Sequence, residues 1–335
     1  MSRMTKPDDH FIELIQRSGS ADKNEALAAQ RELAVALEQP LRKGVLVGDV
    51  LDGIFEKIQM APGSAAEFPL DLLAPGTENE HVAYTNPGHG RIPERAVAGD
   101  YVMVPTYTVA SSIDYLLRYA REARWDVVGR AMQVLEAGFV KKMNDDGWHT
   151  LLAAGVDRNV MVYDADAAIG QFTKRLISLM KTVMRRNAGG NSGSLNRGKL
   201  TDIYLSPEAL EDIRNWGIDQ VDEVTRREIY QAGDDAAAIT RIFGVNLHDM
   251  DELGASQEYQ NFYTDQLSGT FTGSDVELVV GLDLSANDSF IMPVKQDVQI
   301  FEDDALHRQQ RAGFYGWAEI GFAVLDNRRI LLGGF

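Results

Sequence analysis

The sequence predicts an α+β protein built around one very long helix. Three observations lead to this prediction. Apolar residues recur at three- and four-residue steps between 113 and 145, which is the spacing of one helix face. Residues 44–110 lose that spacing and become rich in Gly, Pro, Asn and Thr. Residues 199–335 contain runs with the composition of strands, separated by turn residues and short helices.

The composition is that of a globular protein. The chain has 335 residues, of which 44% are hydrophobic and 25% charged, and at about 150 residues per domain it can form two domains with a sizeable core. The absence of cysteine excludes disulfides, thiolate metal sites, iron–sulfur clusters and a cysteine nucleophile. The N-terminus lacks the apolar core of a signal peptide, and no run reaches the ~20 apolar residues of a membrane span. We therefore expect a soluble protein made in a cytoplasm, without a membrane as partner.

The charge is strongly acidic. The chain has 33 Lys and Arg against 50 Asp and Glu, a net charge of −17. Much of the excess lies between 201 and 265, where 15 acids face 4 bases. Because such a chain is repelled by phosphate backbones, sequence-specific nucleic-acid binding is disfavoured. Solubility is the ordinary interpretation of this charge.

The first 110 residues predict helices followed by a long extended loop. Residues 9–39 are expected to form one or two short helices that end at Pro40. Two extended runs, Ile54–Pro69 and Tyr101–Ala110, bracket residues 70–100, which have little apolar patterning. A long weakly patterned excursion is uncommon unless it is functional, and an isolated two-stranded ribbon is marginally stable. We expect the loop to lie on another surface, such as a neighbouring subunit.

The long helix is predicted from sequence spacing and its end signals. Ser111 with Asp114 predicts a capping box at the start, and Gly147 predicts the stop. At 1.5 Å per residue such a helix is about 50 Å long. A second amphipathic helix is predicted over 166–186, followed by a surface loop over 188–198.

The remaining residues predict a separate α/β unit and returning strands. Strand Thr201–Leu205 leads to Ser206, a predicted N-cap, and Pro207 at the first helical position. That helix is expected to run to Trp216. The other expected elements are a helix over 221–231, strands around 239–247, 277–283 and 289–301, and paired strands over Ala312–Leu325 and Arg329–Leu332.

A search for catalytic and binding motifs predicts no catalytic, cofactor or metal site. The run from Gly193 to Lys199 has phosphate-loop glycines, but Leu200 replaces the required Ser or Thr, and the run follows a helix instead of a strand. The histidines are scattered, and His248 with Glu252 lacks the second histidine of a metal-binding helix. Adjacent acids on predicted turns normally point apart into water, so they do not indicate a general acid–base pair. No cofactor is predicted.

The order of elements resembles that of the tailed-bacteriophage major capsid proteins, which have the Hong Kong-ninety-seven-type fold. Three stretches carry the local resemblance. LTDIYLSPEALEDIRNW at 200–216 is similar to the family's entrance into its A-domain. The run VGLDL at 280–284 with FIMPV at 290–294, and RAGFYGW at 311–317, are similar to its closing strands.

The resemblance implies a division into the family's parts. These are an N-terminal arm (1–53), an E-loop (54–110), a first P-domain part (111–198) with the spine helix at 112–146, an A-domain (199–300) and the C-terminal P-domain strands (301–335). The E-loop would lie across an adjacent subunit, with candidate contact residues Phe68, Leu70, Leu72, Leu73, Tyr84, Arg91 and Ile92. The spine helix would be held by Leu116, Ala120, Val127, Ala131 and Leu135.

The function implied by the resemblance is structural, not enzymatic. The chain would assemble with itself into hexamers and pentamers of an icosahedral shell that encloses double-stranded DNA without sequence-specific binding. Its other partners would be a separate scaffolding protein, a portal and decoration proteins, and it would be located in the virion after assembly in the bacterial cytoplasm. Two alternatives stay open: an encapsulin-like nanocompartment shell, and a soluble α/β enzyme with an unrecognised site.

Overall fold

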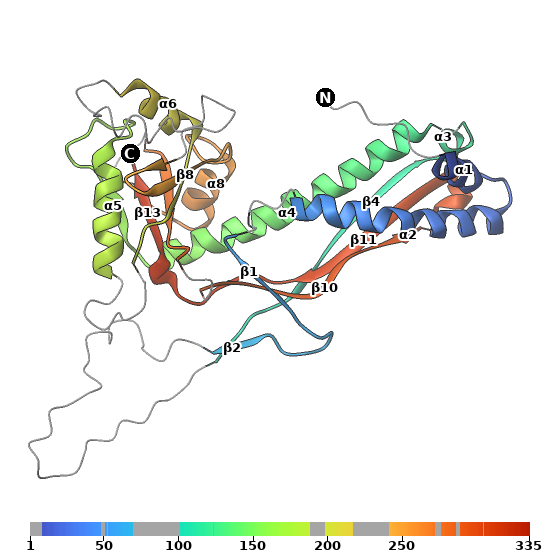
Figure 1. Ribbon diagram of the computed structural model, residues 1–335, viewed down its shortest axis with the longest axis horizontal. Helices are drawn as coiled ribbons and strands as arrows, with labels where there is room; N and C mark the ends of the chain where they lie inside the picture. The colour runs from blue at the N-terminus through green and yellow to red at the C-terminus, as the bar shows by residue number, and fades with distance from the viewer. Residues whose placement is uncertain are drawn as a thin grey trace, which may run out of the picture. The chain divides into compact units, whose positions relative to one another are not determined.

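A computed structural model of the chain describes residues 9–47, 51, 53–69, 101–122, 124–187, 198–216, 241–271, 276–285, 289–303 and 305–335 (Figure 1). Its backbone contacts divide the chain into two compact units. The first comprises Met1–Glu67, Met103–Gly147 and Met292–Phe322, and the second comprises Phe68–Val102, Trp148–Ile291 and Ala323–Phe335.

The first unit is built on an antiparallel sheet with strand order β1-β10-β11-β4. The strands are β1 (Glu56–Gln59), β4 (Tyr107–Leu116), β10 (Phe290–Glu302) and β11 (Arg311–Ile320). Strands β11 and β4 pair without interruption from Arg311 opposite Leu116 to Ile320 opposite Tyr107. Figure 1 shows β4, β10 and β11 side by side. This sheet supports the long helix.

Helix α4 (Trp125–Asp157) presents one buried stripe in the first unit. The stripe consists of Val128, Met132, Leu135, Phe139 and Met143, which follow one another at three- and four-residue steps. Gly316 of β11 faces the Phe139 ring, whose two nearest carbons lie 3.4 Å from the position of an added Cβ. The Gln299 carbonyl oxygen, 2.8 Å from that position, leaves no room for a side chain there.

Three further helices belong to the first unit: α1 (Asp9–Ser18), α2 (Lys23–Val47) and α3 (Leu117–Arg121). Helix α1 packs against both α2 and α3. The Arg121 guanidinium Nε donates to the Gly19 carbonyl oxygen at 2.6 Å, and Arg31 forms an ion pair with Glu302 of β10 at 2.6 Å. The N-terminal helices are therefore attached to their own unit by backbone and side-chain contacts.

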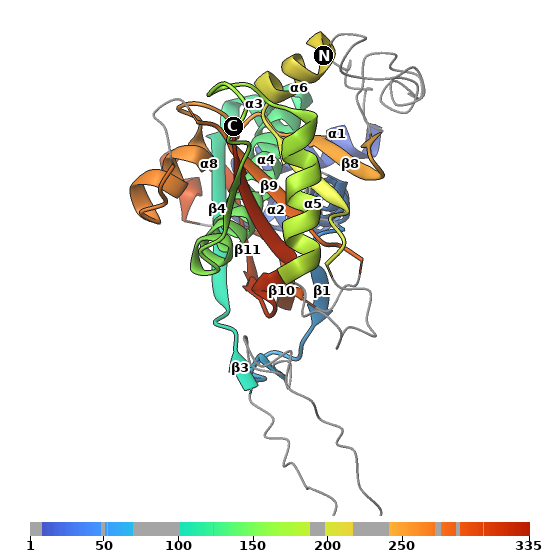
Figure 2. The ribbon, with the colours of Figure 1, turned by 90° about the vertical axis from the view of Figure 1, so that its left-hand side faces the viewer.

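The second unit contains a mixed sheet with strand order β5-β13-β9-β6-β8-β7. The strands are β5 (Met161–Tyr163), β6 (Asp202–Leu205), β7 (Arg241–Ile242), β8 (Val245–Asp249), β9 (Leu278–Leu282) and β13 (Ile330–Gly334). The helices are α5 (Lys174–Asn187), α6 (Pro207–Asn215) and α8 (Glu258–Asn261), followed by the π-helical turn Phe262–Gln266. Figure 2 shows α5 lying along β13. Strand β12 (Ala323–Val324) pairs with the first residues of β10.

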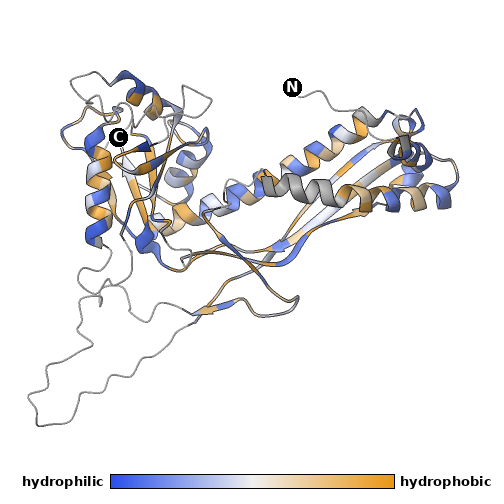
Figure 3. Ribbon diagram, viewed as in Figure 1, coloured by the Kyte–Doolittle hydropathy of each residue, from blue (hydrophilic) through white to orange (hydrophobic). Residues whose placement is uncertain are grey.

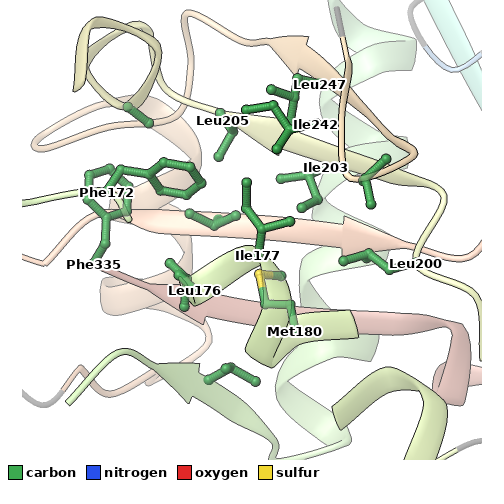
Figure 4. Close-up of a cluster of buried hydrophobic side chains, with 14 of the residues drawn as sticks. Phe172, Leu176, Ile177, Met180, Leu200, Ile203, Leu205, Ile242, Leu247 and Phe335 are labelled. Atoms are coloured by element: carbon green, nitrogen blue, oxygen red, sulfur yellow. The ribbon is translucent and has the colours of Figure 1, made fainter. Parts of the chain in front are cut away.

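The core of the second unit lies between α5, α6 and the sheet. Leu176, Ile177 and Met180 of α5 are fully buried in one cluster with Ile203 of β6 (Figure 4). Gly281 of β9 allows this close packing, because an added Cβ would stand 2.8 Å from the Met180 Cε atom. Figure 3 shows the polar and apolar stretches that alternate along α5. One side of the helix therefore faces the core, and its charged side chains lie on the other.

The structure corrects the predicted limits of the long helix. A helix was expected over 112–146, but residues up to Leu116 continue strand β4, and α4 begins at Trp125 and runs to Asp157. Ser111 and Asp114 are strand residues, so they form no capping box. The apolar residues of this region fit the spacing of a helix and the alternation of a half-buried strand equally well. Backbone pairing with β11 therefore selects the strand conformation.

Gly147 also has a different role from the predicted one. It lies inside α4, where an added Cβ would stand 2.1 Å from the Leu51 Cδ1 atom. The glycine is therefore a packing position for Leu51, and the helix continues through it because helix interiors tolerate glycine at a cost of about 1 kcal/mol.

Two other helix limits differ from the predicted ones. Helix α2 continues through Pro40 to Val47, since a proline removes one backbone donor and bends a helix without always ending it. Helix α5 begins at Lys174 and not at 166. The Thr173 hydroxyl oxygen accepts from the Leu176 backbone N–H, which places the start of α5 at this cap.

The local elements predicted for the α/β unit are confirmed where the structure describes them, but the limits of the unit are not. Ser206 caps α6 by accepting from the Ala209 backbone N–H at 3.2 Å, and Pro207 is the first helical residue. Strands β7 to β11 and β13 lie close to the residues expected for them. Two expectations about them are wrong: most of β10 belongs to the first unit, and β11 and β13 lie in different sheets and do not pair with each other. The predicted helix over 221–231 and most of the loop over 188–198 lie outside the described residues.

Candidate assembly surfaces

The base of the predicted extended loop is a two-stranded ribbon. Strands β2 (Glu67–Pro69) and β3 (Tyr101–Met103) pair with each other, and the Val104 backbone N–H donates to the Ala66 carbonyl oxygen at 2.8 Å. Tyr101 and Met103 point to one side of β3, and each is 66% exposed. Two large exposed apolar side chains on a short strand form a surface that suits a further contact.

Only one of the seven predicted loop contacts can be placed. Phe68 lies in the middle of β2 and is half-buried. The other six lie outside the described residues, namely Leu70, Leu72, Leu73, Tyr84, Arg91 and Ile92. Tyr101 and Met103 of β3 were not among the predicted contacts, although the alternation of apolar residues in YVM is a signal that could have indicated them.

The predicted core residues of the spine helix are distributed over three elements. Leu116 ends strand β4 and Ala120 is buried in α3, so neither belongs to the long helix. Leu135 is buried in α4 as predicted. Val127 and Ala131 of α4 are half-buried. They lie beside the buried stripe, which contains the next residue in each case, Val128 and Met132.

Tyr107 joins the start of β4 to α4. Its hydroxyl donates to the Asp146 carboxylate at 2.8 Å. Partial burial raises the pKa of Tyr107, and the hydrogen bond and negative charge of Asp146 raise it further. The Asp146 carboxylate also accepts from the Lys142 ammonium at 2.7 Å, one helical turn away. This group fixes the strand that leads out of the loop against the long helix.

The structure gives the last two residues of the phosphate-loop candidate another role, while residues 193–197 lie outside the described residues. The backbone N–H groups of Gly198 and Lys199 donate to the buried Asp283 carboxylate at 2.7 and 3.1 Å. These donors, which a phosphate would need, are satisfied within the fold. Asp283 was not predicted as a functional residue, and its position directly after the apolar strand β9 is the only signal for it in the sequence.

The residues that could bind a metal ion do not gather into a site. Within the described residues, no group of three His, Asp or Glu side chains has an arrangement that could hold an ion. His248 instead contacts Asp202, with its Nε2 atom 2.8 Å from the carboxylate. Among the described helices none has the length and apolar character of a membrane span.

Replacing Asp202 by Asn is expected to lower the stability of the second unit by about 1–3 kcal/mol at neutral pH. Burial raises the pKa of Asp202, but hydrogen bonds from His248, Thr201 and Asn246 outweigh it, so the net pKa lies below its ordinary value. Because the pKa of this carboxyl is lower in the folded than in the unfolded protein, its ionised form stabilises the fold at pH values above the unfolded pKa, which is near 4. This stabilisation is lost as the pH falls through the pKa of the folded protein.

The measurement is the free energy of unfolding in urea for the wild type and Asp202→Asn between pH 7 and pH 3. The difference between the two proteins should shrink below about pH 4. Asp265→Asn, which changes an exposed carboxylate of the same unit, is the control and should change little at any pH. A difference that stays constant down to pH 3 would contradict the role of the ionised carboxylate.

Arg158 closes the second unit at the start of β13. Its Nη1 atom donates to the Arg328 carbonyl oxygen at 2.7 Å and also to the Ile330 carbonyl oxygen. Burial lowers the pKa of Arg158, although Asp326 counteracts this effect. This residue was missed by sequence reasoning, because a single arginine near a helix end gives no signal that it will bind carbonyl groups far along the chain.

The comparisons with known proteins agree on one architecture. The chain is similar to the cyanophage Pam1 capsid, with a TM-score of 0.59 and 13% identity over 84% of this chain and 88% of that one. It is similar to a structure from Microbacterium phage Oxtober96, with a TM-score of 0.56 and 10% identity over 86% and 90% of the chains. The mature capsid of bacteriophage PhiM1 gives a TM-score of 0.53 and 10% identity over 85% and 86%.

These likenesses extend over most of the chain and across structures from several phages. Neither a protein-family model nor a curated protein sequence matches it. At 10 to 13% identity the structural likeness shows the fold. The long helix, the antiparallel sheet beside it and the mixed sheet of the second unit are therefore parts of one known architecture. The chain has the α+β Hong Kong-ninety-seven-type fold of the tailed-phage capsid proteins.

Proposed function

We propose that this chain is the major capsid protein of a tailed double-stranded DNA phage. The observation that supports the proposal most is the similarity to the Pam1 capsid structure, at a TM-score of 0.59 over 84% of the chain. A shell subunit needs large surfaces for contact with copies of itself, and not a catalytic pocket. In this role the chain forms hexamers and pentamers that close into an icosahedral shell around DNA.

The two units suit the parts of such a subunit. In this proposal, the first unit provides the P-domain, with α4 as the spine helix beside the sheet of β4, β10 and β11. The second unit provides the A-domain, which includes α5, β5 and β13. This assignment differs from the one implied by the resemblance alone, which placed residues 166–186 and the last strand in the P-domain. Residues 54–110 are proposed as the E-loop and 1–53 as the N-terminal arm.

The proposed partners follow from the shell. The first partner is the chain itself, since each subunit contacts several copies. A separate scaffolding protein, a portal and decoration proteins are proposed as further partners, assembly is proposed to occur in the bacterial cytoplasm, and the virion is the proposed final location. The acidic chain is proposed to enclose DNA without gripping it, because a net charge of −17 repels phosphate groups.

The test is electron microscopy of the full-length chain, expressed alone and with the scaffolding gene from its own genome. We expect closed particles with hexamers and pentamers in at least one of the two preparations. Particles of only a few subunits under varied salt, with scaffold present, would contradict the proposal.

The content of the particles separates the two kinds of shell. A phage capsid is expected to occur beside portal and terminase genes and to contain nuclease-protected DNA after infection. An encapsulin-like compartment would contain a protein cargo instead. A soluble enzyme would show neither particle nor cargo, and it would need a substrate pocket lined by convergent polar groups.

A further inference from the structure

A basic groove runs along helix α5 of the second unit. It has a volume of about 1210 Å³. Its lining includes six basic residues and, among the described residues that line it, no acid. The basic residues are Lys174, Arg175, Lys181, Arg185, Arg186 and Lys199. In a chain with a net charge of −17, a groove of this sign is an exception that needs a reason.

The cations at the first turn of α5 are partly neutralised within the fold. Arg175 forms ion pairs with Asp164, at 3.5 Å, and with Asp166. Arg185 and Arg186, near the other end of the helix, are exposed and form no ion pair with any described residue. Basic residues stabilise the carboxyl end of a helix, which accounts for part of the positive charge at this end of the groove. Lys199, on the segment that enters β6, adds a further cation.

An exposed aromatic side chain borders this end of the groove. Phe243 is 41% exposed and has a φ of +51°, a backbone conformation that non-glycine residues adopt at a cost. It forms the turn between β7 and β8 together with Gly244, and the Lys181 ammonium donates to its carbonyl oxygen at 2.6 Å. Aromatic residues and arginines are enriched in the centres of protein–protein interfaces, where lysines are depleted.

A complementary acidic surface lies at the other end of the same two strands. Strands β6 and β8 are parallel; Lys199 and Phe243 precede them, whereas Glu208 and the turn Asp249–Glu252 follow them. The side chains of Glu208, Asp249, Asp251 and Glu252 are exposed. Partial burial and the charge of Asp251 raise the pKa of Asp249, and the charge of Arg214 counteracts them only in part, so this surface keeps an excess of negative charge.

These two surfaces cannot meet within one copy. They lie at opposite ends of strands of four and five residues, which span roughly 15 Å. Between two copies they can meet head to tail. Such a contact uses a different surface on each partner, and it closes into a ring when the rotation between copies is favourable.

We propose that the basic groove at Lys181, Arg185 and Lys199 binds the acidic turn Asp249–Glu252 of a second copy of this chain. This inference deepens the proposed shell function, because it names the charged contact that joins neighbouring subunits of one ring. Phe243 provides the apolar contact beside the ion pairs. Duplex DNA is the less suitable occupant, because phosphates are repelled by the rest of this acidic chain and offer no apolar partner for an exposed phenyl ring.

The test is a charge exchange in the full-length chain. One variant, the basic reversal, combines Arg185→Glu and Lys199→Glu, and another, the acidic reversal, combines Asp251→Lys and Glu252→Lys. Each alone removes two attractive charges from one surface and puts two repulsive charges in their place, and should raise the critical concentration for assembly by about tenfold or more. The variant with all four changes has restored complementarity and should assemble at close to the wild-type concentration. Sedimentation velocity and electron microscopy measure the assembled fraction.

A mixture gives a second, independent readout. The basic reversal keeps the native acidic turn and has acids at positions 185 and 199, whereas the acidic reversal keeps the native basic groove and has lysines at positions 251 and 252. At these positions opposite charges meet only between unlike copies. Equal amounts of the two variants should therefore assemble into rings with an even number of alternating copies, at a concentration at which neither variant assembles alone. The control changes the same net charge elsewhere, with Lys23→Glu and Arg308→Glu, which are exposed residues of the first unit. It should assemble like the wild type.

Each other outcome identifies which proposal fails. If the basic reversal and the acidic reversal each assemble as well as the wild type, and the wild type forms shells, the charged contact is overturned and the shell function stands. A further outcome is that the basic reversal and the acidic reversal both lose assembly, and that neither the variant with all four changes nor the mixture restores it. If circular dichroism shows that these variants are folded, and if Arg185→Gln assembles, this outcome overturns the contact as well. Small rings that respond to charge exchange as expected, without any closed shells, would support the charged contact and contradict the proposed shell function.

Duplex DNA is examined with the same proteins by fluorescence anisotropy at several salt concentrations. We expect no binding by the wild type above that of the basic reversal. Wild-type binding that is lost only in the basic reversal, together with unchanged assembly, would overturn the proposal in favour of a nucleic-acid surface.

Discussion

Replacement of residues 70–100 by an Asn-Gly turn is expected to give a folded protein that no longer forms shells. Strands β2 and β3 pair at the base of this segment, so a two-residue hairpin turn can join them. The described core residues of both units all come from other parts of the chain, so the variant keeps them. We expect the loss to fall on the proposed contacts with neighbouring subunits, since shell closure multiplies the effect of each weak contact. Electron microscopy and sedimentation measure the particles.

A second variant separates the length of the loop from its side chains. It keeps the native length but replaces residues 70–100 by glycine and serine. We expect this variant also to fail in assembly, since the seven predicted contacts from Phe68 to Ile92 include six in the replaced segment. Unchanged circular dichroism and melting temperature are the controls for folding. Particles of normal size from the shortened variant would show that the loop is not an assembly element.

Phe139→Ala is expected to destabilise the first unit by about 3–5 kcal/mol. The side chain is 0% exposed and packs from the long helix onto Gly316 of β11. Its removal leaves a cavity that the backbone of the sheet cannot fill, so the cost exceeds the transfer free energy of the lost atoms. The measurement is urea unfolding of the non-assembling loop variant, which separates folding from shell stability.

The matched control is Val134→Ala in the same helix. Val134 is 59% exposed, so its truncation should change the free energy of unfolding by less than about 0.5 kcal/mol. Equal effects of the two substitutions would show that α4 does not lie on the sheet with this face. A change at Phe139 below about 1 kcal/mol would have the same meaning.

Local signals predicted the elements whose ends are determined by a few neighbouring residues. Ser206 and Pro207 define the start of α6 because a side-chain acceptor and a missing backbone donor act within one turn. The strands that follow were also predicted, since apolar runs of four to eight residues between turn residues have few other uses. The order of these elements was sufficient to indicate the fold.

The assembly surfaces were less predictable. The exposed pair on β3 and the groove residues Lys199 and Phe243 come from segments far apart in the sequence, and a surface exists only after the sheet has brought its strands together. A count of acids and bases showed where the negative charge lies along the chain. It did not show that the cations of α5 gather beside the turn between β7 and β8.

The sequence by itself determined the class of fold, the absence of disulfides and the capped start of α6, because composition and short-range hydrogen bonds do not depend on distant residues. The tertiary structure alone decided that the extended run predicted to end at Ala110 continues as a strand through residues 111–116, since pairing with β11 outweighs helical spacing. It likewise decided that α4 passes through Gly147, where Leu51 fills the space of a side chain. In both places two local conformations are close in free energy, and packing against a distant segment selects one of them.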